Sequence, residues 1–266
     1  FQALRILSYV DPAELKSFDA RSLHLLTEAL KIGWKDRDLL GDPDFVSVPI
    51  AELLGDAKAR RGADQILSGK VATSSTRADS GIHTVNVCAC DAQNNAVSLT
   101  VTTGFLFGSQ RAVPGTGLIL GHGMSRFDYI PGHANFPAPL KRMQHNMSPC
   151  IAVKDGKARF IFGLPGGTRI VSVTAQLAVG LIDFGMTPAQ ITDAPRIHTE
   201  GAEPLTVTES LPEPICAELV KIGHQLSKEP TVGGPSNAIS IGADGKLEAA
   251  SSPREEAWVP TDRKRD

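Results

Sequence analysis

The first third of the chain carries two stretches in which apolar residues recur three and four positions apart, as on one face of an α-helix. The first stretch follows Asp11-Pro12-Ala13-Glu14, which has the capping Asp, the early Pro and the acidic residue typical of a helix start. The spacing predicts helices over residues 12–37 and from 53 to about 67. Residues 68–83 are small, polar and unpatterned, which predicts an exposed loop.

Directly after this loop the apolar period changes to two. Apolar and polar residues alternate over 85–102, on both sides of a turn-like polar segment at 91–95. The pattern predicts a β-hairpin with one apolar and one polar face. If the hairpin turns at Gln93, Thr84 lies directly opposite Thr102 on the polar face, with the two β-carbons ~5 Å apart.

The rest of the chain mixes strands, helices and one long irregular region. Residues 103–147 are rich in Gly, Pro and His and have little periodicity, which is typical of a loop that is either functional or disordered. The elements predicted after it are a hairpin over about 151–162, a helix beginning near Thr168, a helix with a capping box from Ser210 to about Gly223, and a hairpin over 238–250. This order of elements predicts a layered α+β domain.

The composition is that of a globular protein with a real core, since 41% of the 266 residues are apolar and 21% are charged. The net charge is −2 and basic residues do not cluster, so nucleic acid is not an expected partner. No uninterrupted apolar run reaches the ~18 residues typical of a membrane span. The sequence starts at Phe1 without an initiator Met or a signal-peptide pattern, so either the natural start was removed or a longer protein precedes it. The compartment is therefore not predicted.

Thr84 is a candidate nucleophile because it stands at the edge of an exposed loop with a second hydroxyl beside it. A threonine hydroxyl is a weak nucleophile unless a base is adjacent. A cut between His83 and Thr84 would create that base, because it frees an α-amino group with an ordinary pKa of about 7.7. The alternative is that Thr84 simply begins an ordinary strand, as many threonines do.

The second candidate element is the glycine-rich stretch Gly163-Leu164-Pro165-Gly166-Gly167-Thr168, at a predicted strand-to-helix junction. Glycines there let backbone N–H groups approach a ligand, and a helix N-terminus favours negative charge. That suits the oxyanion formed when a hydroxyl attacks a carbonyl. The stretch fits neither a phosphate-binding P-loop nor G-x-G-x-x-G, so a nucleotide is not expected. The alternative is a tight turn with a Thr cap.

Taken together, these motifs resemble the γ-glutamyltranspeptidase family of N-terminal-nucleophile hydrolases, and the resemblance covers essentially the whole chain. The hairpin segment DAQNNAVSLTVT looks like the family's "D-x-x-G-N-A-V-S-x-T" stretch after the nucleophile. Further family landmarks occur in order at residues 36–46, Phe107-Gly108-Ser109, Pro139-Leu140-Lys141-Arg142, Met147-Ser148-Pro149 and 163–170. So many ordered matches make the resemblance specific.

The resemblance implies a fold and a division of the chain. The family fold is a four-layer αββα sandwich, and the family precursor cuts itself before a Thr to give two subunits. Residues 1–83 would then be the C-terminal part of the large subunit, helical and ending in the processing loop. Residues 84–266 would be the small catalytic subunit. The remainder of the large subunit becomes an expected partner, and a homo-oligomer stays open.

The resemblance also implies roles for single residues. Counting back from Asn95-Ala96-Val97-Ser98 places the family's nucleophile on Thr84 and the scissile bond between His83 and Thr84. Thr102 falls on the family's assisting hydroxyl, in agreement with the hairpin register. Gly166 and Gly167 fall on the glycines that bind the oxyanion.

The chain departs from the family pattern where the γ-glutamyl group would bind. Gly104 replaces an Asn, Ser125-Arg126 replaces an acidic pair, and His145-Asn146 replaces Ser-Ser. A cation at Arg126 would repel a substrate ammonium. His145, together with the pair Thr84-Val85, looks more like the oxamate amidohydrolase branch of the family. We therefore expect Gly104, Arg126, His145 and Asn146 to line a site for an amide with a small anionic acyl group.

Three functions remain open at this point. The leading one is hydrolysis of such an amide through an acyl-Thr84 ester, and the second is true γ-glutamyl transfer or glutathione hydrolysis. The third, from another class, is an uncleaved homologue that binds without catalysis. No cofactor is implied, and no metal is predicted because His122, His133 and His145 lack the spacing of zinc ligands. Four cysteines are too few for a disulfide framework.

Overall fold

The computed structural model describes residues 1–72 and 84–252. The N-terminal part is helical and consists of α1 (Gln2–Leu7), η1 (Pro12–Glu14), α2 (Ala20–Lys35), η2 (Asp36–Leu39), α3 (Ile50–Leu53) and α4 (Asp56–Leu67). The part after residue 83 contains β1 (Thr84–Cys90), β2 (Ala96–Thr102), η3 (Gly123–Arg126), β3 (Cys150–Lys154), β4 (Lys157–Gly163), α5 (Arg169–Ile182), α6 (Pro188–Asp193), β5 (Ile197–His198), β6 (Leu205–Thr208), α7 (Glu213–Ile222), β7 (Leu226–Glu229), β8 (Asn237–Ile241) and β9 (Leu247–Ser251).

The long helix α2 organises the helical part. It packs against α1, α4 and α7, and its buried apolar side chains share one core with theirs. The helix begins at Ala20, where the Asp19 carboxylate accepts a hydrogen bond from Ser22 N. The predicted start at Asp11 was therefore wrong in extent, because Asp11 caps only the single turn η1. A second capping Asp, eight residues later, sets the beginning of the long helix.

The strands after residue 83 form three sheets, ordered β1-β2, β3-β4-β8-β9 and β5-β6-β7. In the first sheet Thr84 pairs with Thr102, Asn86 with Thr100 and Cys88 with Ser98. This register confirms the prediction that the hairpin turns at Gln93. The hairpins predicted at 151–162 and 238–250 are confirmed as β3-β4 and β8-β9.

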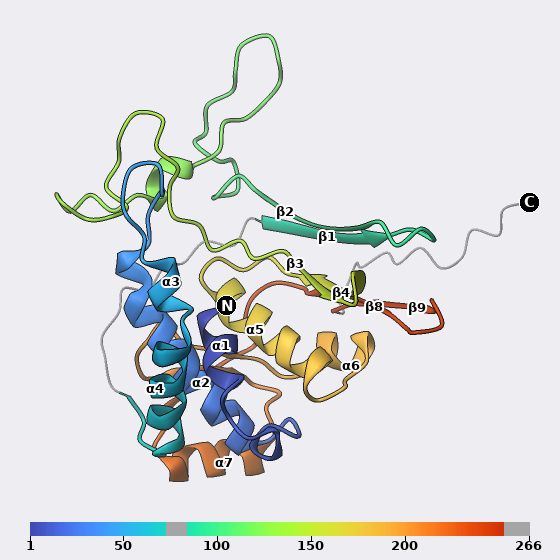
Figure 1. Cartoon of the computed structure of the whole chain (residues 1–266). Coiled ribbons are helices and arrows are strands. Elements are labelled where there is room, and N and C mark those ends of the chain that lie inside the picture. Colours follow the sequence, from blue (N-terminus) through green and yellow to red (C-terminus); the bar gives the residue numbers. More distant parts are fainter. Residues whose placement is uncertain (73–83, 253–266) are drawn as a thin grey trace, which may run out of the picture.

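The hairpin β1-β2 lies over one face of the four-stranded sheet, and α5 and α6 cover the other face (Figure 1). Ile161 and Ile239 of the four-stranded sheet and Cys88 and Ala96 of the hairpin fill the space between the two sheets. A second core, with Phe162, Leu177 and Ala238, fills the space between the sheet and the helices. These are three successive layers. The second helical layer of the expected four-layer sandwich is not found among residues 1–72 and 84–252.

The polar face of the hairpin is the one that packs inward. Ser98 Oγ donates to the Phe162 carbonyl at 3.0 Å, and Asn237 Nδ2 donates to the Asn86 carbonyl at 2.8 Å. The opposite, apolar face of the hairpin is more than half exposed at every large side chain: Val85, Val87, Val97, Leu99 and Val101. Among the described residues this is a large exposed apolar face, which is typical of an interaction surface.

Two segments that carried the family resemblance meet in space. The Asp42 carboxylate accepts from Arg142 N at 2.7 Å and from Arg142 Nη2 at 2.6 Å, across a hundred residues of sequence. Asp42 is buried, so this pairing ties the end of the helical part to the loop region that precedes β3. In the part of the chain that the structure describes, no helix is both long and apolar enough to span a membrane.

Candidate active site

Thr84 and Thr102 face each other at the open end of the hairpin. Thr84 Oγ1 lies 2.9 Å from Thr102 Oγ1 and donates a hydrogen bond to it. Thr102 Oγ1 also accepts from the backbone N–H of Gly104 at 2.9 Å. The structure therefore joins three of the predicted site residues in one hydrogen-bonded group. His83 lies outside the described residues.

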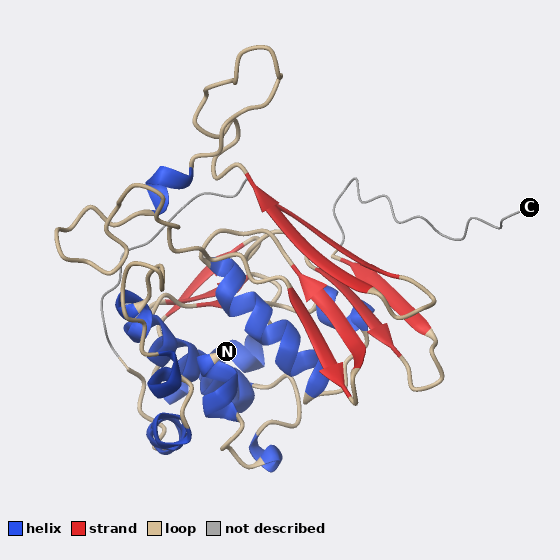
Figure 2. Cartoon of the chain, turned by 45° about the horizontal axis from the view of Figure 1, so that its top comes forward, coloured by secondary structure: helices blue, strands red, loops and turns tan. Residues whose placement is uncertain are grey.

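Contacts between the hairpin and β4 fix where this group points. Asn94 pairs with the backbone of Ala158, Ser98 binds the carbonyl of Phe162, and the Asn86 side chain rests on Gly163. Moving from the turn of the hairpin to its open end thus moves along β4 from its start to its end (Figure 2). Thr84 lies two residues beyond Asn86 on the same face of β1. It is therefore directed past the C-terminal end of β4, where the glycine-rich stretch begins.

That stretch forms a tight turn between β4 and α5, as predicted. Gly166 and Gly167 have φ values of +148° and +62°, a region that favours glycine. A β-carbon on Gly166 would also lie 2.9 Å from Gly233 Cα. Thr168 is the N-cap residue of α5, but its side chain makes no capping hydrogen bond. The tight turn of the alternative interpretation is therefore found, but the Thr168 side chain does not cap the helix.

Gly104 begins the long loop, at a position whose backbone conformation and close neighbour favour glycine. Its φ is +86°, and a β-carbon there would lie 3.1 Å from His122 Cβ. His122 N donates to the Thr103 carbonyl at 2.7 Å, so His122 lies beside the Thr84–Thr102 group. From the sequence, a pocket-lining or hydrogen-bonding role was preferred to a zinc ligand for His122, but the sequence did not place it beside Thr84. No local pattern marks it, because it is brought here by the fold of the loop.

The remaining predicted residues gather around a second arginine. Arg37 Nη2 donates to Asn146 Oδ1 at 2.5 Å, and Gln144 Nε2 donates to the Arg37 carbonyl. Burial lowers the pKa of His145, and the positive charges of Arg126 and Arg37 lower it further. His145 is therefore influenced by the charges of Arg126 in η3 and Arg37 in η2, and Asn146 is bonded to Arg37. Sequence reasoning named Arg126 and missed Arg37, which belongs to the helical part.

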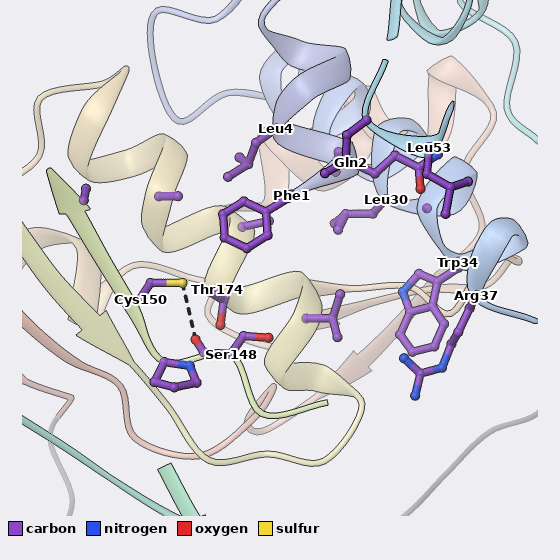
Figure 3. Close-up of a pocket in the computed structure, with 18 of the residues that line it drawn as sticks. Phe1, Gln2, Leu4, Leu30, Trp34, Arg37, Leu53, Ser148, Cys150 and Thr174 are labelled. Carbon is purple, nitrogen blue, oxygen red and sulfur yellow. Dashed lines mark hydrogen bonds between the residues drawn. The ribbon is translucent and has the colours of Figure 1, made fainter. Parts of the chain in front are cut away.

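One cavity lies apart from the Thr84 group. A cavity of about 680 Å³ lies between α1, α2, β3 and α5, and its lining is mainly apolar (Figure 3). Trp34 Nε1 and Thr174 Oγ1 are buried there and have no hydrogen-bond partner among residues 1–72 and 84–252. Arg37 lies on the rim and connects the cavity to Asn146. The cavity includes neither Thr84 nor the glycine turn, so it is not the candidate active site.

Among the described residues, one group has the composition of a metal site. His24, Glu28 and His224 are buried and offer ligand atoms within 4.8 Å of one another. Lys31 Nζ already binds Glu28 Oε1 at 2.7 Å and Glu203 Oε1 at 2.6 Å, and Glu203 Oε1 also pairs with His224 Nδ1. A buried ammonium at this position would repel a divalent cation. The group therefore fits a hydrogen-bonded ion network better than a metal centre.

Comparison with known proteins places this geometry in context. The family model for gamma-glutamyltranspeptidase matches residues 1–259. The acylase ACY 1 proenzyme of Pseudomonas sp. (strain SE83) is 39% identical over 253 residues, which are 94% of this chain and 45% of the relative. The glutathione hydrolase proenzyme of Escherichia coli (strain K12) is 33% identical over 270 residues, covering 95% of this chain and 47% of the relative. The chain thus spans about half the length of these relatives.

Solved structures agree. Cephalosporin acylase from Bacillus halodurans superposes with a TM-score of 0.80 at 25% identity, covering 94% of this chain and 46% of that one. Gamma-glutamyltranspeptidase from Pseudomonas nitroreducens superposes with a TM-score of 0.60 at 29% identity, covering 67% of this chain and 100% of that one. With a family model that matches nearly every residue and relatives above 30% identity, this chain belongs to the gamma-glutamyltranspeptidase family.

Proposed function

We propose that this chain carries the catalytic half of an amidohydrolase that cuts itself between His83 and Thr84 and then uses Thr84 as its nucleophile. The observation that carries the proposal is the Thr84–Thr102 hydroxyl pair at the open end of the hairpin, directed past the end of β4 toward the turn at Gly166 and Gly167. The contact between the hairpin and the four-stranded sheet would thus bring together the nucleophile, the assisting hydroxyl and the backbone donors for an oxyanion.

The reaction divides into two acyl transfers. Thr84 Oγ1 attacks the amide carbonyl while its proton passes to the freed α-amino group, whose ordinary pKa of about 7.7 suits a base near neutral pH. The resulting oxyanion is held by N–H groups of the Gly166–Gly167 turn. The C–N bond then breaks, and the amine leaves with the proton. Water attacks the Thr84 ester in the same manner, which releases the acid and restores the hydroxyl.

Self-cleavage uses the same hydroxyl on a different carbonyl. Thr84 Oγ1 attacks the His83 carbonyl, and the peptide C–N bond breaks to leave an ester and the free α-amino group of Thr84. Water then hydrolyses the ester, which releases the His83 carboxylate and restores the Thr84 hydroxyl. The naming of the relatives from Pseudomonas and Escherichia coli as proenzymes supports a processed protein.

The acyl group of the substrate is proposed to be small and anionic. Arg126 and Arg37 both place positive charge on His145, and Asn146 is held by Arg37. An ammonium on the substrate would be repelled there and a carboxylate attracted. The similarity to an acylase at 39% identity supports an acyl group other than γ-glutamyl. The glutathione hydrolase of Escherichia coli, at 33% identity, supports γ-glutamyl hydrolysis or transfer as the second candidate.

We also propose that the remainder of the large subunit is the partner of this chain. The relatives are about twice as long, and the apolar face of the hairpin is exposed at Val85 to Val101. The fourth layer of the expected sandwich would cover that face.

Intact-protein mass spectrometry on the full-length protein tests the cleavage. The wild type should give two masses that sum, less one water, to the precursor, with the second chain beginning at Thr84. Thr84→Ala should remain one chain without amidase activity. Full activity from wild-type protein that shows only the uncut mass would exclude the mechanism, and an uncut wild type without activity would favour the binding homologue.

A further inference from the structure

A buried chain of hydrogen bonds runs from the glycine turn to the strand β5. Thr168 Oγ1 donates to Glu200 Oε1 at 2.5 Å, and Glu200 Oε1 lies 3.2 Å from His198 Nε2. The other ring nitrogen, His198 Nδ1, lies 3.0 Å from Ser172 Oγ. Thr168, Ser172 and His198 are each less than a tenth exposed. The chain therefore begins next to Gly167 and returns to α5 one helical turn later.

The Thr168 hydroxyl does not cap the helix that it precedes. A Thr at a helix N-cap ordinarily accepts a hydrogen bond from the N–H two or three residues on. Thr168 makes no such bond, and its hydroxyl points to Glu200 instead. The first turn of α5 is held by backbone bonds from Arg169 N to Gly166 O and from Ile170 N to Gly167 O. The side chain of Thr168 is thus used to bind the turn to β5 and not to close the helix.

Glu200 is suited to hold that hydroxyl permanently. Burial alone would raise the pKa of Glu200, but hydrogen bonds from His198 and Thr168 bring the pKa below its ordinary value. The group is therefore a carboxylate near neutral pH and acts only as an acceptor. Hydrogen bonds to a charged acceptor are about twice as strong as neutral ones, which makes the Thr168 contact a firm one.

We infer that Glu200 and Thr168 are positioning residues that fix the Gly166–Gly167 turn in the geometry needed to bind an oxyanion. The inference rests on the proposed function of that turn. Backbone donors stabilise a developing charge only when they are held in place beforehand, and an error of about 1 Å can cost on the order of 100-fold in rate. Gly166 and Gly167 have no side chains through which the fold could hold them. Thr168 is the first residue after them that has one.

The glycines themselves are poor places to test this, because φ values of +148° and +62° strain any replacement. Thr168→Val keeps the shape of the side chain and removes the hydroxyl, whereas Thr168→Ser keeps the hydroxyl. Glu200→Leu removes the acceptor, whereas Glu200→Gln keeps one acceptor oxygen. Thr187→Val is the matched control, since Thr187 is also a helix N-cap but closes α6 through a hydrogen bond from Gln190 N.

The measurement is kcat and KM for a glutaryl anilide with full-length, cleaved protein, normalised to the cleaved mass. Thr168→Val and Glu200→Leu should lower kcat roughly 10- to 100-fold and change KM less than about threefold, since only the transition state loses its donors. Thr168→Ser and Glu200→Gln should stay within about threefold of wild-type kcat. Thr187→Val should lower the unfolding midpoint without lowering kcat.

Several outcomes would overturn the inference. One is a folded Thr168→Val or Glu200→Leu whose kcat stays within about twofold of wild type. Another is an equal loss of kcat in Thr187→Val, which would mean that general destabilisation explains the effect. If neither Thr168→Val nor Glu200→Leu gives folded, cleaved protein, Ser172→Ala decides the matter. It removes the contact of Ser172 Oγ with His198 Nδ1 together with two longer contacts to the Thr199 backbone. It should lower kcat about threefold or more at constant KM, and no change would count against the inference.

Thr84→Ala in the same assay separates this inference from the proposed function. Turnover by Thr84→Ala would reject Thr84 as the nucleophile, whatever the Thr168 variants do. An inactive Thr84→Ala together with an unaffected Thr168→Val would reject only the positioning role.

Discussion

The side chain of Asn86 occupies the space above Gly163, so that a β-carbon on Gly163 would lie 2.4 Å from Asn86 Nδ2. Asn86 is not free to move away, because its Nδ2 donates to Thr100 Oγ1 at 3.0 Å and its carbonyl accepts from Asn237. This contact sets the separation of the hairpin and the four-stranded sheet near their catalytic ends. It is the point at which the position of Thr84 depends most directly on a single glycine.

Gly163→Ala should therefore destabilise the protein and displace Thr84. Overpacking a tight contact costs about 1–3 kcal/mol, which would appear as a lower urea midpoint with an unchanged m-value. Gly33→Ala is the control, because its β-carbon would meet only Gln2 Oε1 at 3.8 Å and a helical Gly-to-Ala change favours folding by roughly 0.5–1 kcal/mol. Equal midpoints for Gly163→Ala and wild type would show that the two sheets can separate without cost.

Thr102→Val tests the hydroxyl pair. Under the proposed mechanism the Thr84 hydroxyl loses its acceptor and Gly104 N loses its partner, while the shape of the hairpin is kept. A neutral hydrogen bond contributes about 0.5–1.5 kcal/mol, so kcat should fall roughly 2- to 10-fold or more. Thr102→Ser should retain most of the activity. A Thr102→Val enzyme as fast as Thr102→Ser would remove this hydroxyl from the reaction.

Acid should destabilise the folded protein in two steps, through His24 and Glu203 of the buried ion network around Lys31. Burial, together with the positive charges of His224, Arg21 and Lys31, lowers the pKa of His24 to about 4. Between about pH 6.5 and 4 the imidazole is therefore protonated in the unfolded chain but not in the folded chain. The free energy of unfolding falls as the pH drops through this range. Burial acts to raise the pKa of Glu203, but hydrogen bonds from His224 and Lys31 outweigh it and lower that pKa to about 2. Its contribution is present above about 4.5 and is lost between there and pH 2.

Urea midpoints of the wild type at pH 7, 5 and 3 measure this dependence. His24→Phe should flatten the change between pH 7 and 5, because the variant has no imidazole to titrate. Glu203→Gln should flatten the change between pH 5 and 3, although it is less stable at every pH since Lys31 loses a charged partner. A His24→Phe variant with the wild-type slope between pH 7 and 5 would contradict the assignment.

The parts of the site that follow from one stretch of sequence were predictable. The alternation over 85–102 and its polar turn determine the register, so the pairing of Thr84 with Thr102 follows from the order of residues alone. The glycine turn between β4 and α5 was predictable for the same reason, since a strand pattern ends and a helical pattern begins there. The roles of these residues stay proposals, because register and turn geometry describe position and not reactivity.

Features that depend on contacts between distant segments were not predictable. The Arg37–Asn146 bond and the Thr168–Glu200 bond each join residues more than thirty positions apart. The capping box predicted at Ser210 was wrong, because Pro212 is the N-cap of α7 and makes no side-chain bond. A true capping box, at Thr187 and Gln190, opens α6, whose six residues are too few to show a helical period. The sequence also did not show that the polar face of the hairpin packs inward, because this depends on the backbone and amide groups of the four-stranded sheet that bind it.

The last prediction concerns the choice of substrate. Arg126 stands where the family pattern has an acid, and both Arg126 and Arg37 place positive charge on His145. A charge within about 4–6 Å of a substrate ammonium changes from attractive to repulsive when an acid becomes an arginine, and each tenfold in rate corresponds to about 1.4 kcal/mol. The kcat/KM ratio of γ-glutamyl-p-nitroanilide to its des-amino glutaryl analogue should therefore be well below one.

Arg126→Asp should raise this ratio by weakening the glutaryl reaction more than the γ-glutamyl reaction. Arg142→Gln, which removes an arginine bound to Asp42, is the control and should lower stability without changing the ratio. A wild-type ratio well above one would mean that Arg126 does not face the acyl group, and glutathione hydrolysis would then be the preferred function.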